Sequence, residues 1–328
     1  MILILSGADD LHADHVAEML RCRSAPVVRF DPASFPSRAQ ISLAYSPSGR
    51  NEAVLYADGS RMDLAEVSAV WYRRPGAPVA HAEIRDSAAR AYIELECSMV
   101  MQDLWSLLCD TWLPGRPLAV RRAEQKAFQL KTAASLGFEL PPTVITNRPD
   151  ELLELYRKHD GLVVSKQAAT AFPSTVGFGM VRFTELVTTR DVAHAQTLSY
   201  CPMILQAYVP KRMELRITVV GRRVFAAEIH SQANNRTRHD WRRYHLARTP
   251  HLPHELPRDV ERRCVGLVEA LGLQYGAIDM IVTPDGRYVF VEINPNGQYL
   301  WIEYQTGLPI SEAICDLLLD ETRERAVA

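Results

Sequence analysis

The sequence predicts an α/β protein whose N-terminal part begins a doubly wound parallel sheet. Residues 2–5 form an apolar run typical of a buried strand, Asp9 or Asp10 then supplies a helix N-cap, and residues 27–30 form the next strand, so the chain opens as β-α-β. Farther along, helices alternate with hairpins at residues 214–230 and 275–296. No GxGxxG phrase follows the first strand, so a dinucleotide-binding fingerprint is not supported.

The composition is that of a globular protein with room for two or three domains. The chain has 328 residues, of which 47% are hydrophobic and 23% charged, and its net charge is -2. That charge indicates neither nucleic acid nor an anionic membrane as the partner and favours small or peptide ligands. The six cysteines are scattered without a CxxC pair, which favours neither a zinc site nor a disulfide framework. No apolar run approaches about 18 residues and the first residues lack a basic leader, so we expect a cytoplasmic protein.

Residues 1–117 are predicted to form the first α/β domain. A hairpin joins residues 41–45 to 53–56, a strand covers 67–72, and a long helix covers 88–108. Residues 112–117 contain two prolines and a glycine, cannot continue a helix, and mark the domain boundary. Arg73 and Arg74 follow the strand at its carboxyl end, where open α/β sheets bind ligands, so they predict an anionic partner. A charged loop beside an edge strand explains the two arginines equally well.

Residues 118–203 are predicted as a second unit in which two lysines stand out. Lys126 lies on a helix over 121–136 that Gly137 ends, and Lys166 is the last residue of a strand over 161–166. A helix over 150–158 precedes that strand, and a loop over 167–179 follows it. A strand-end lysine either points its charge into a cleft or snorkels to solvent, and for a lysine taken alone the second explanation is the more common one.

A strand over 202–210 leads into the third unit, residues 204–328, which continues with the hairpin of residues 214–230. Two loop lengths are compatible with this hairpin. We expect a three-residue loop, because it places Glu228 opposite Arg216 and leaves apolar residues on the other face. The polar face is then a site candidate, although an exposed salt-bridge ladder has a similar pattern. Its members are Glu214, Arg216, Thr218, Glu228 and His230.

Residues 231–244 form a polar, basic segment that contains Arg236 and Arg242 among four arginines. Arginines beside an aromatic residue bind phosphate or carboxylate groups, and an extended acidic peptide is a further candidate target. A solvated loop is the simpler explanation for each arginine taken alone. Helices over 257–272 and 308–323 complete the unit.

The hairpin of residues 275–296 carries the strongest signal for a site. Its turn, residues 283–286, has proline second and glycine fourth; if Thr283 pairs with Gly286, Asp279 lies opposite Phe290. The period of two then places three oxygen donors on one face of the sheet, and hard donors of this kind suit Mg²⁺. A solvated strand face with incidental acids is the alternative. The three donors are Asp279, Glu292 and Asn294.

Together these residues resemble a known superfamily. The order of Lys126, Lys166, a strand over 206–209, the Glu-Leu-Arg at 214–216, and the donor set of the last hairpin is similar to that of the ATP-grasp superfamily, from about residue 115 onward. The Trp-Tyr-Arg-Arg-Pro run at 71–75, with Ser-Gln at 231–232 and Asp-Trp-Arg at 240–242, further resembles the graspetide synthetases. The resemblance implies an ATP-grasp fold preceded by an α/β pre-ATP-grasp domain.

The resemblance also implies roles for individual residues. The lysines would contact ATP phosphates, the strand over 206–209 and the acid that follows it would bind the nucleotide, and the last hairpin would hold Mg²⁺. The catalytic residues would be Arg216, which would stabilise phosphoryl and acyl-phosphate charge, and Glu228, which would position the acceptor or donor. Four arginines would contact the substrate. The implied sets are Lys126, Lys166, Gln206, Tyr208, Val209 and Glu214 for ATP, Asp279, Glu292 and Asn294 for the metal, and Arg73, Arg74, Arg236 and Arg242 for the substrate.

The implied activity is ATP-dependent macrocyclisation of a ribosomal precursor peptide that has a leader and an acidic, threonine-rich core. Its Asp or Glu side chains would become acyl phosphates, and Ser, Thr or Lys side chains would capture them as esters or amides. The loop over 167–179 would exclude water from the intermediate. The resemblance further implies a homodimer without a nucleic-acid or membrane partner. A ligase acting on a free amino acid or protein terminus, and an idle nucleotide-binding module, are the alternatives.

Overall fold

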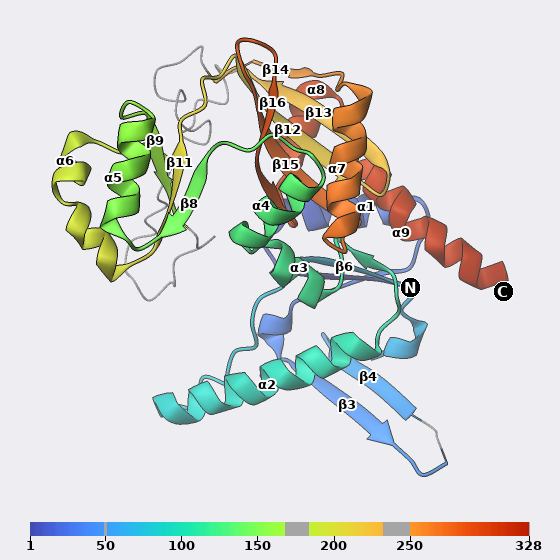
Figure 1. Cartoon of the computed structure of the whole chain (residues 1–328). Coiled ribbons are helices and arrows are strands. Elements are labelled where there is room, and N and C mark those ends of the chain that lie inside the picture. The colour runs from blue at the N-terminus through green and yellow to red at the C-terminus, as the bar shows by residue number, and fades with distance from the viewer. Residues whose placement is uncertain (49–50, 168–183, 232–249, 328) are drawn as a thin grey trace.

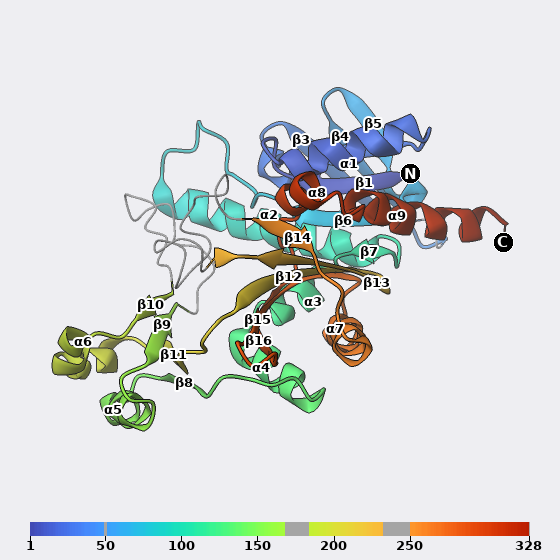
Figure 2. The same cartoon turned by 90° about the horizontal axis from the view of Figure 1, so that it is seen from above.

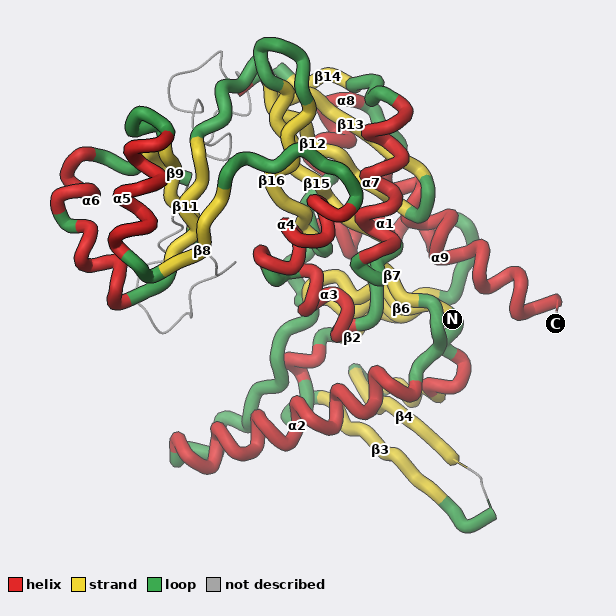
Figure 3. The backbone as a smooth tube through the Cα atoms, in the orientation of Figure 1, coloured by secondary structure: helices red, strands yellow, loops and turns green. Residues whose placement is uncertain are grey.

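The described residues form four β-sheets, which Figures 1 and 3 show in one orientation. The computed structural model describes residues 1–48, 51–167, 184–231 and 250–327, with side chains as far as residue 319. In Figure 1 the unit containing β8 to β11 stands to the left of the sheet that contains β12 to β16, and the long helix α2 lies below both. None of the described helices is both long and apolar enough to cross a lipid bilayer.

The first sheet confirms the predicted β-α-β opening. Its parallel strands have the order β2-β1-β6-β7, formed by β1 (Ile2–Ser6), β2 (Val27–Phe30), β6 (Ala69–Arg74) and β7 (Trp112–Leu113). Asp10 caps α1 (Leu11–Cys22) by accepting hydrogen bonds from the backbone nitrogens of His12 (2.9 Å) and Ala13 (3.2 Å). β6 contains a bulge, because Leu5 pairs with Tyr72 whereas Ser6 pairs with Arg74.

A small antiparallel sheet and the long helix α2 complete the N-terminal part. The predicted hairpin is present as β3 (Ala39–Tyr45) and β4 (Asn51–Ala57), and a third strand that was not predicted, β5 (Ser60–Asp63), pairs with β4. The helix α2 (Ser87–Leu107) agrees with the predicted range within one residue at each end. Met101, Leu104 and Trp105 on its inner face pack into a core with Leu3 and Leu5 of β1.

The central unit corrects one predicted helix. Instead of one helix over 121–136, the chain forms α3 (Pro117–Ala123) and α4 (Lys126–Ser135), because the backbone of Gln125 is extended. The antiparallel sheet that follows has the order β10-β9-β11-β8 and is covered by two helices and a 3₁₀ turn. These elements are β8 (Thr143–Thr146), α5 (Pro149–Lys158), β9 (Val163–Lys166), β10 (Glu185–Leu186), α6 (Thr189–Ala193), the turn Ala195–Tyr200 and β11 (Met203–Ala207).

β11 spans the predicted boundary after residue 203 and pairs with both β8 and β9. Its last four residues therefore belong to the sheet of the central unit. The domain boundaries themselves stay a prediction.

The third unit is an antiparallel sheet with both faces covered. Its order is β14-β13-β12-β15-β16, and Figure 2 shows α8 and α9 on the side of the sheet that faces the first unit, with α4 and α7 on the other side. Separate apolar cores, one containing Leu215 and Met280 and the other Val220 and Ala227, fill the two sides. The elements are β12 (Met213–Val220), β13 (Arg223–Ile229), β14 (His251–Pro253), α7 (Arg258–Ala270), β15 (Tyr275–Val282), β16 (Tyr288–Asn294), α8 (Leu300–Thr306) and α9 (Ile310–Val327).

The predicted registers of the two hairpins were wrong. In the first, Val220 pairs with Arg223, so the loop has two residues and Glu228 lies opposite Leu215 rather than Arg216. The prediction assumed that one face of this hairpin is polar. In the structure apolar side chains pack against both faces of the sheet, so the register of the two-residue loop leaves no apolar side chain of the hairpin without apolar neighbours.

In the second hairpin, Val282 pairs with Tyr288, and a bulge follows Asp279. Asp279 is therefore opposite Glu292 rather than Phe290. The two local shifts add to two residues, an even number, so the predicted face is preserved.

Candidate functional site

Three oxygen-bearing side chains meet where β15 and β16 run side by side. Asp279 pairs with Glu292 across the two strands, and Ala277 pairs with Asn294, so the predicted donors share one face. The Asn294 amide nitrogen lies 3.3 Å from Asp279 Oδ2 and 3.5 Å from Glu292 Oε1. A half-turn of that amide presents its oxygen instead, so all three side chains are able to ligate a hard cation. The structure brings the predicted metal donors together.

Two cations neutralise these carboxylates. Arg216, which is 5% exposed, donates from Nη1 to Asp279 Oδ1 (2.9 Å) and from Nη2 to the Gln298 carbonyl (3.1 Å). Lys126 Nζ lies 2.7 Å from Glu292 Oε2. Because these pairs are largely buried, removing one partner leaves a charge that solvent screens poorly. The site therefore contains two ion pairs, Arg216 with Asp279 and Lys126 with Glu292.

Gln129, which was not predicted, joins α4, the helix that carries Lys126, to β16. Gln129, on the next turn of α4, is buried and donates from Nε2 to the carbonyls of Ala123 (2.5 Å) and Ile293 (2.8 Å). Its Oε1 accepts from the Ile293 nitrogen at 3.3 Å. The side chain thus adds a partner to β16 and joins the end of α3 to the start of α4. A glutamine among apolar positions of a short helix is a signal that could have pointed to it.

A second group of predicted residues lies on the central unit. Lys166, at the end of β9, donates from Nζ to Gln206 Oε1 on β11 (2.7 Å), and Gln206 donates in turn to Thr143 Oγ1 on β8 (2.8 Å). Tyr208 follows β11 and donates its backbone N–H to the Leu162 carbonyl (2.8 Å). Val209 lies beside it in the connection to β12. Lys166 and Gln206 thus lie on the two inner strands of the central sheet, and Tyr208 and Val209 follow the end of β11.

Glu214 stands at the start of β12, two residues before Arg216 and on the same face. Its Oε1 accepts from Lys211 Nζ at 2.6 Å, and the two side chains are only 10% and 6% exposed. A buried pair of this kind fixes the acid in one position. Lys211 was not predicted. Its position three residues before Glu214 is the feature of the sequence that could have indicated an ion pair.

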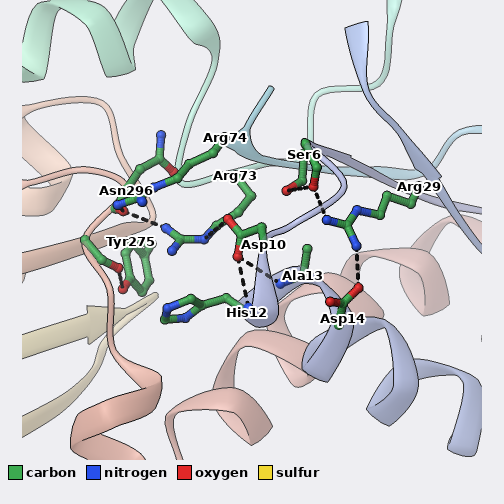
Figure 4. A network of polar contacts seen from close by, with 12 residues as sticks. Ser6, Asp10, His12, Ala13, Asp14, Arg29, Arg73, Arg74, Tyr275 and Asn296 are labelled. Atoms are coloured by element: carbon green, nitrogen blue, oxygen red, sulfur yellow. Dashed lines mark hydrogen bonds and ion pairs between the residues drawn. The ribbon is translucent and has the colours of Figure 1, made fainter. Parts of the chain in front are cut away.

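Arg73 is buried and Arg74 is exposed, and both contact the loop that follows β16 (Figure 4). Arg73 is 2% exposed and donates from Nη1 to the carbonyl of Asn296 (2.6 Å), while its Nε lies 3.2 Å from Asp10 Oδ2. Arg74 reaches the same carbonyl from Nη2 at 3.4 Å. Both arginines therefore touch the segment that follows the metal donors. Arg236 and Arg242, the other predicted substrate contacts, lie outside the described residues, as does nearly all of the loop over 167–179.

Glu228 is separated from Arg216 by the sheet. Because the two-residue turn shifts the register, Glu228 shares the face of Leu215, where it lies 2.8 Å from His230 Nε2 and 2.7 Å from His254 Nδ1. His254 Nε2 in turn lies 3.0 Å from the Tyr288 hydroxyl. Burial alone would raise the pKa of Glu228, but the hydrogen bonds to His254 and His230 outweigh it and hold that pKa below its usual value. A catalytic role for Glu228 stays a prediction.

Known proteins share this arrangement over nearly the whole chain. Residues 1–115 match the family model described as the MvdD pre-ATP grasp domain. The fold is similar to that of a RiPP-associated ATP-grasp ligase of Chryseobacterium gregarium, in complex with ADP and a leader and core peptide: identity is 34%, coverage 98% of this chain and 96% of that chain, and the TM-score 0.88. The fold is also similar to that of macrocyclase MdnC of Microcystis aeruginosa MRC, bound with precursor peptide MdnA. The identity is 32%, the match covers 97% of this chain and 99% of that chain, and the TM-score is 0.85.

A probable alpha-L-glutamate ligase of Teredinibacter turnerae is more distant. It is 25% identical over 222 residues, which cover 66% of this chain and 70% of that protein.

Proposed function

The chain belongs to the RiPP-associated ATP-grasp ligases, and from that premise we propose that it uses ATP to activate side-chain carboxylates of a ribosomal precursor peptide. A carboxylate oxygen of Asp or Glu attacks the γ-phosphorus, forming an acyl phosphate and releasing ADP. A Ser or Thr hydroxyl, or a Lys amine, of the same peptide then attacks the acyl carbon, loses its proton and expels inorganic phosphate. The product is an ester or amide crosslink, and the peptide has lost the elements of one water.

The observation that carries this proposal is the charge cluster around Asp279 in the middle of β15 and Glu292 near the end of β16. Phosphoryl transfer requires positioning and charge stabilisation more than covalent help from the protein. Among the described residues no three His, Cys, Asp or Glu side chains form a metal site, so the third protein donor is the amide of Asn294 beside Asp279 and Glu292. This set fits Mg²⁺, which takes one or two carboxylates and leaves its other positions to water and phosphate oxygens. When bound there, Mg²⁺ would neutralise phosphate charge and orient the γ-phosphate.

Arg216 is the residue to which we assign stabilisation of the transferring phosphoryl group. Its Nη1 and Nη2 are used by Asp279 and Gln298, but its buried Nε has no hydrogen-bond partner within the described ranges. An Arg donor held beside two carboxylate metal ligands is suited to a phosphate or acyl-phosphate oxygen. We assign no chemical step to Glu228, because it lies on the opposite face of the sheet.

The nucleotide would lie between the central unit and the third unit. We propose that Lys126 and Lys166 contact its phosphates, that Gln206, Tyr208 and Val209 line the adenine, and that Glu214 binds the ribose. The buried Lys211–Glu214 pair supports the last assignment, because it holds the acid on the same face as Arg216. Lys166 is hydrogen-bonded to Gln206, so the residue proposed to contact phosphate is linked directly to a residue proposed to line the adenine.

A second candidate function is ligation of a free amino acid. It is favoured by the similarity to a probable alpha-L-glutamate ligase, which covers 66% of this chain. Such an enzyme would use the same ATP and metal residues, and only the acceptor would differ. The discriminating observation is the mass of the product, because ligation adds a residue whereas macrocyclisation removes water.

The proposal is tested by incubating the purified chain with ATP, Mg²⁺ and a short precursor peptide encoded beside it. We expect one ADP and one phosphate for each water that the peptide loses, measured by mass spectrometry and a coupled ADP assay. Glu292→Gln should abolish the mass change, because it removes a metal ligand and the partner of Lys126. Glu52→Gln, which changes an exposed acid on β4, is the matched control. A peptide of unchanged mass, with a free amino acid consumed instead, would contradict the proposal.

A further inference from the structure

The segment that follows β16 is held by side chains from three different strands. We call residues 294–298 the donor loop, because Asn294 stands at its start. The Asn296 carbonyl accepts from Arg73 of β6 (2.6 Å), the Gly297 carbonyl from the Tyr275 hydroxyl of β15 (2.7 Å), and the Gln298 carbonyl from Arg216 of β12 (3.1 Å). Three successive carbonyls are thus fixed from outside the loop. Because Asn294 begins this loop and Arg216 is bonded to its last residue, these bonds help to fix the positions of both side chains.

Of the three, only Arg73 comes from the N-terminal sheet. Its guanidinium lies 3.2 Å from Asp10 Oδ2, and Asp10 is at the same time the N-cap of α1, where it accepts from the backbone of His12 and Ala13. A continuous set of polar contacts therefore runs from the start of α1 through Asp10 and Arg73 to the Asn296 carbonyl (Figure 4). It joins residues that are 223 positions apart in the chain.

The bulge in β6 explains how two consecutive arginines reach one carbonyl. In a regular strand neighbouring side chains point to opposite faces, so only one of Arg73 and Arg74 would face the donor loop. The pairing of Ser6 with Arg74, directly after that of Leu5 with Tyr72, leaves Arg73 as the extra residue. Bulges of this kind redirect a side chain and are common beside active sites. The result is a 2.6 Å bond from Arg73 and a weaker 3.4 Å contact from Arg74 to the same oxygen.

We infer that Arg73 is a positioning residue that couples the N-terminal domain to the metal and phosphate site. It acts through the Asn296 carbonyl on the donor loop, and through the loop on Asn294 and Arg216, without itself touching ATP or metal. Its guanidinium is 2% exposed and its Nη1 is bonded to the Asn296 carbonyl, so we assign Arg73 to the support of this loop rather than to contact with the peptide. The inference rests on the proposed function, since it assigns the donor loop to a metal and nucleotide site.

The test compares Arg73→Met with Arg73→Lys and with Arg29→Met. Arg29 is the matched control, because it lies in the same sheet and, among the described residues, bonds Asp14 and the Gly7 carbonyl but none of residues 294–298. Binding of ADP in the presence of Mg²⁺ is measured by calorimetry, and the Mg²⁺ requirement and the KM for peptide by steady-state kinetics. We expect Arg73→Met to weaken Mg²⁺-dependent ADP binding about tenfold or more, as for loss of a bond from a charged donor, and to leave the peptide KM unchanged.

Arg73→Lys should give an intermediate loss, because lysine lacks the planar fork that spans Asp10 and the Asn296 carbonyl. If Arg73→Met fails to fold, this variant decides the question, together with Asp10→Asn, which keeps the helix cap but removes the partner charge. A raised peptide KM with normal Mg²⁺-dependent ADP binding would overturn the inference and make Arg73 a substrate contact. Since the binding measurement needs no peptide, a wild-type chain that binds ADP with Mg²⁺ but modifies no peptide would refute the proposed function alone.

Discussion

Replacing Gly297 by alanine tests whether the crowded centre of the site is required for activity. A methyl group at Gly297 would lie 2.3 Å from the Cβ of Ala277, 2.6 Å from Arg216 Nη2 and 3.2 Å from the carbonyl oxygen of Asn294. Carbon atoms in contact are ordinarily about 3.5–4.0 Å apart, so the clash with Ala277 alone demands a shift of more than about 1 Å. Position 297 therefore has no room for a side chain larger than that of glycine.

Little around Gly297 is able to give way. Ala277 lies in the interior of the sheet, paired with Thr218 on one side and Asn294 on the other. The displacement must therefore move the donor loop, and with it a metal donor and Arg216. A misplacement of about 1 Å at a reacting group costs on the order of 100-fold in rate, and overpacking a buried position costs about 1–3 kcal/mol of stability.

The assay is ADP release in the presence of precursor peptide and Mg²⁺, with thermal unfolding measured on the same samples. Gly266→Ala is the matched control, because Gly266 lies in α7 and its nearest new neighbour, Leu136 Cδ2, would be 3.9 Å away. Alanine favours a helix over glycine by about 1 kcal/mol, so this control should be active and no less stable. A folded Gly297→Ala chain that releases ADP at the wild-type rate would refute the argument.

Four further variants probe other parts of the site and the cores around it. Lys166→Met should raise the KM for ATP about tenfold if this lysine binds phosphate, whereas an unchanged KM would make it a snorkelling lysine. Gln129→Met should lower the free energy of unfolding by about 1–3 kcal/mol, because it strands the backbone groups of Ile293 that Gln129 now satisfies; an unchanged urea midpoint would contradict this. Because the pKa of Glu228 is lowered on folding, its ionised form stabilises the folded chain above pH 4.5. This contribution is lost as the pH falls through the folded-state pKa. In Glu228→Gln the free energy of unfolding should therefore depend less on pH below 4.5, as measured by acid unfolding. Burial, and after it the charge of Arg73, lowers the pKa of His12 from 6.5 to about 3. Between these two values the unfolded chain binds a proton at His12 that the folded chain does not bind, so this group should lower stability by at most about 1.4 kcal/mol for each unit of decreasing pH. In His12→Phe this contribution should be absent, and stability should fall less steeply with pH than in the native chain.

The two hairpins show which parts of the site the sequence was able to predict. In the hairpin of β15 and β16 the predicted register differed from the observed one by two residues at the donors, and an even shift keeps Asp279, Glu292 and Asn294 on one face. In the hairpin of β12 and β13 the error was one residue, which moved Glu228 to the other face. The difference arose because apolar side chains cover both sides of the sheet, and a periodic pattern read from one strand pair does not show this.

Contacts between units were beyond prediction for another reason. A helix cap at Asp9 or Asp10 follows from local sequence and was predicted, and Asp10 forms it. The pairing of Asp10 with Arg73 depends on the packing of the N-terminal domain, and the bond from Arg73 to the Asn296 carbonyl depends on how that domain packs against the third unit. Gln129 and Gly297 were likewise missed, since a backbone partner and a lack of space leave little trace in a single sequence.

The bulge in β6 also constrains how this protein is able to change in evolution and in design. Deleting one residue between Tyr72 and Arg74 would restore a regular ladder with β1, a change that local stability would favour. It would also leave a single arginine facing the loop after β16. The number of residues in this strand is therefore under as much functional constraint as their identity, and libraries that vary its length should lose active members faster than libraries that vary its apolar positions.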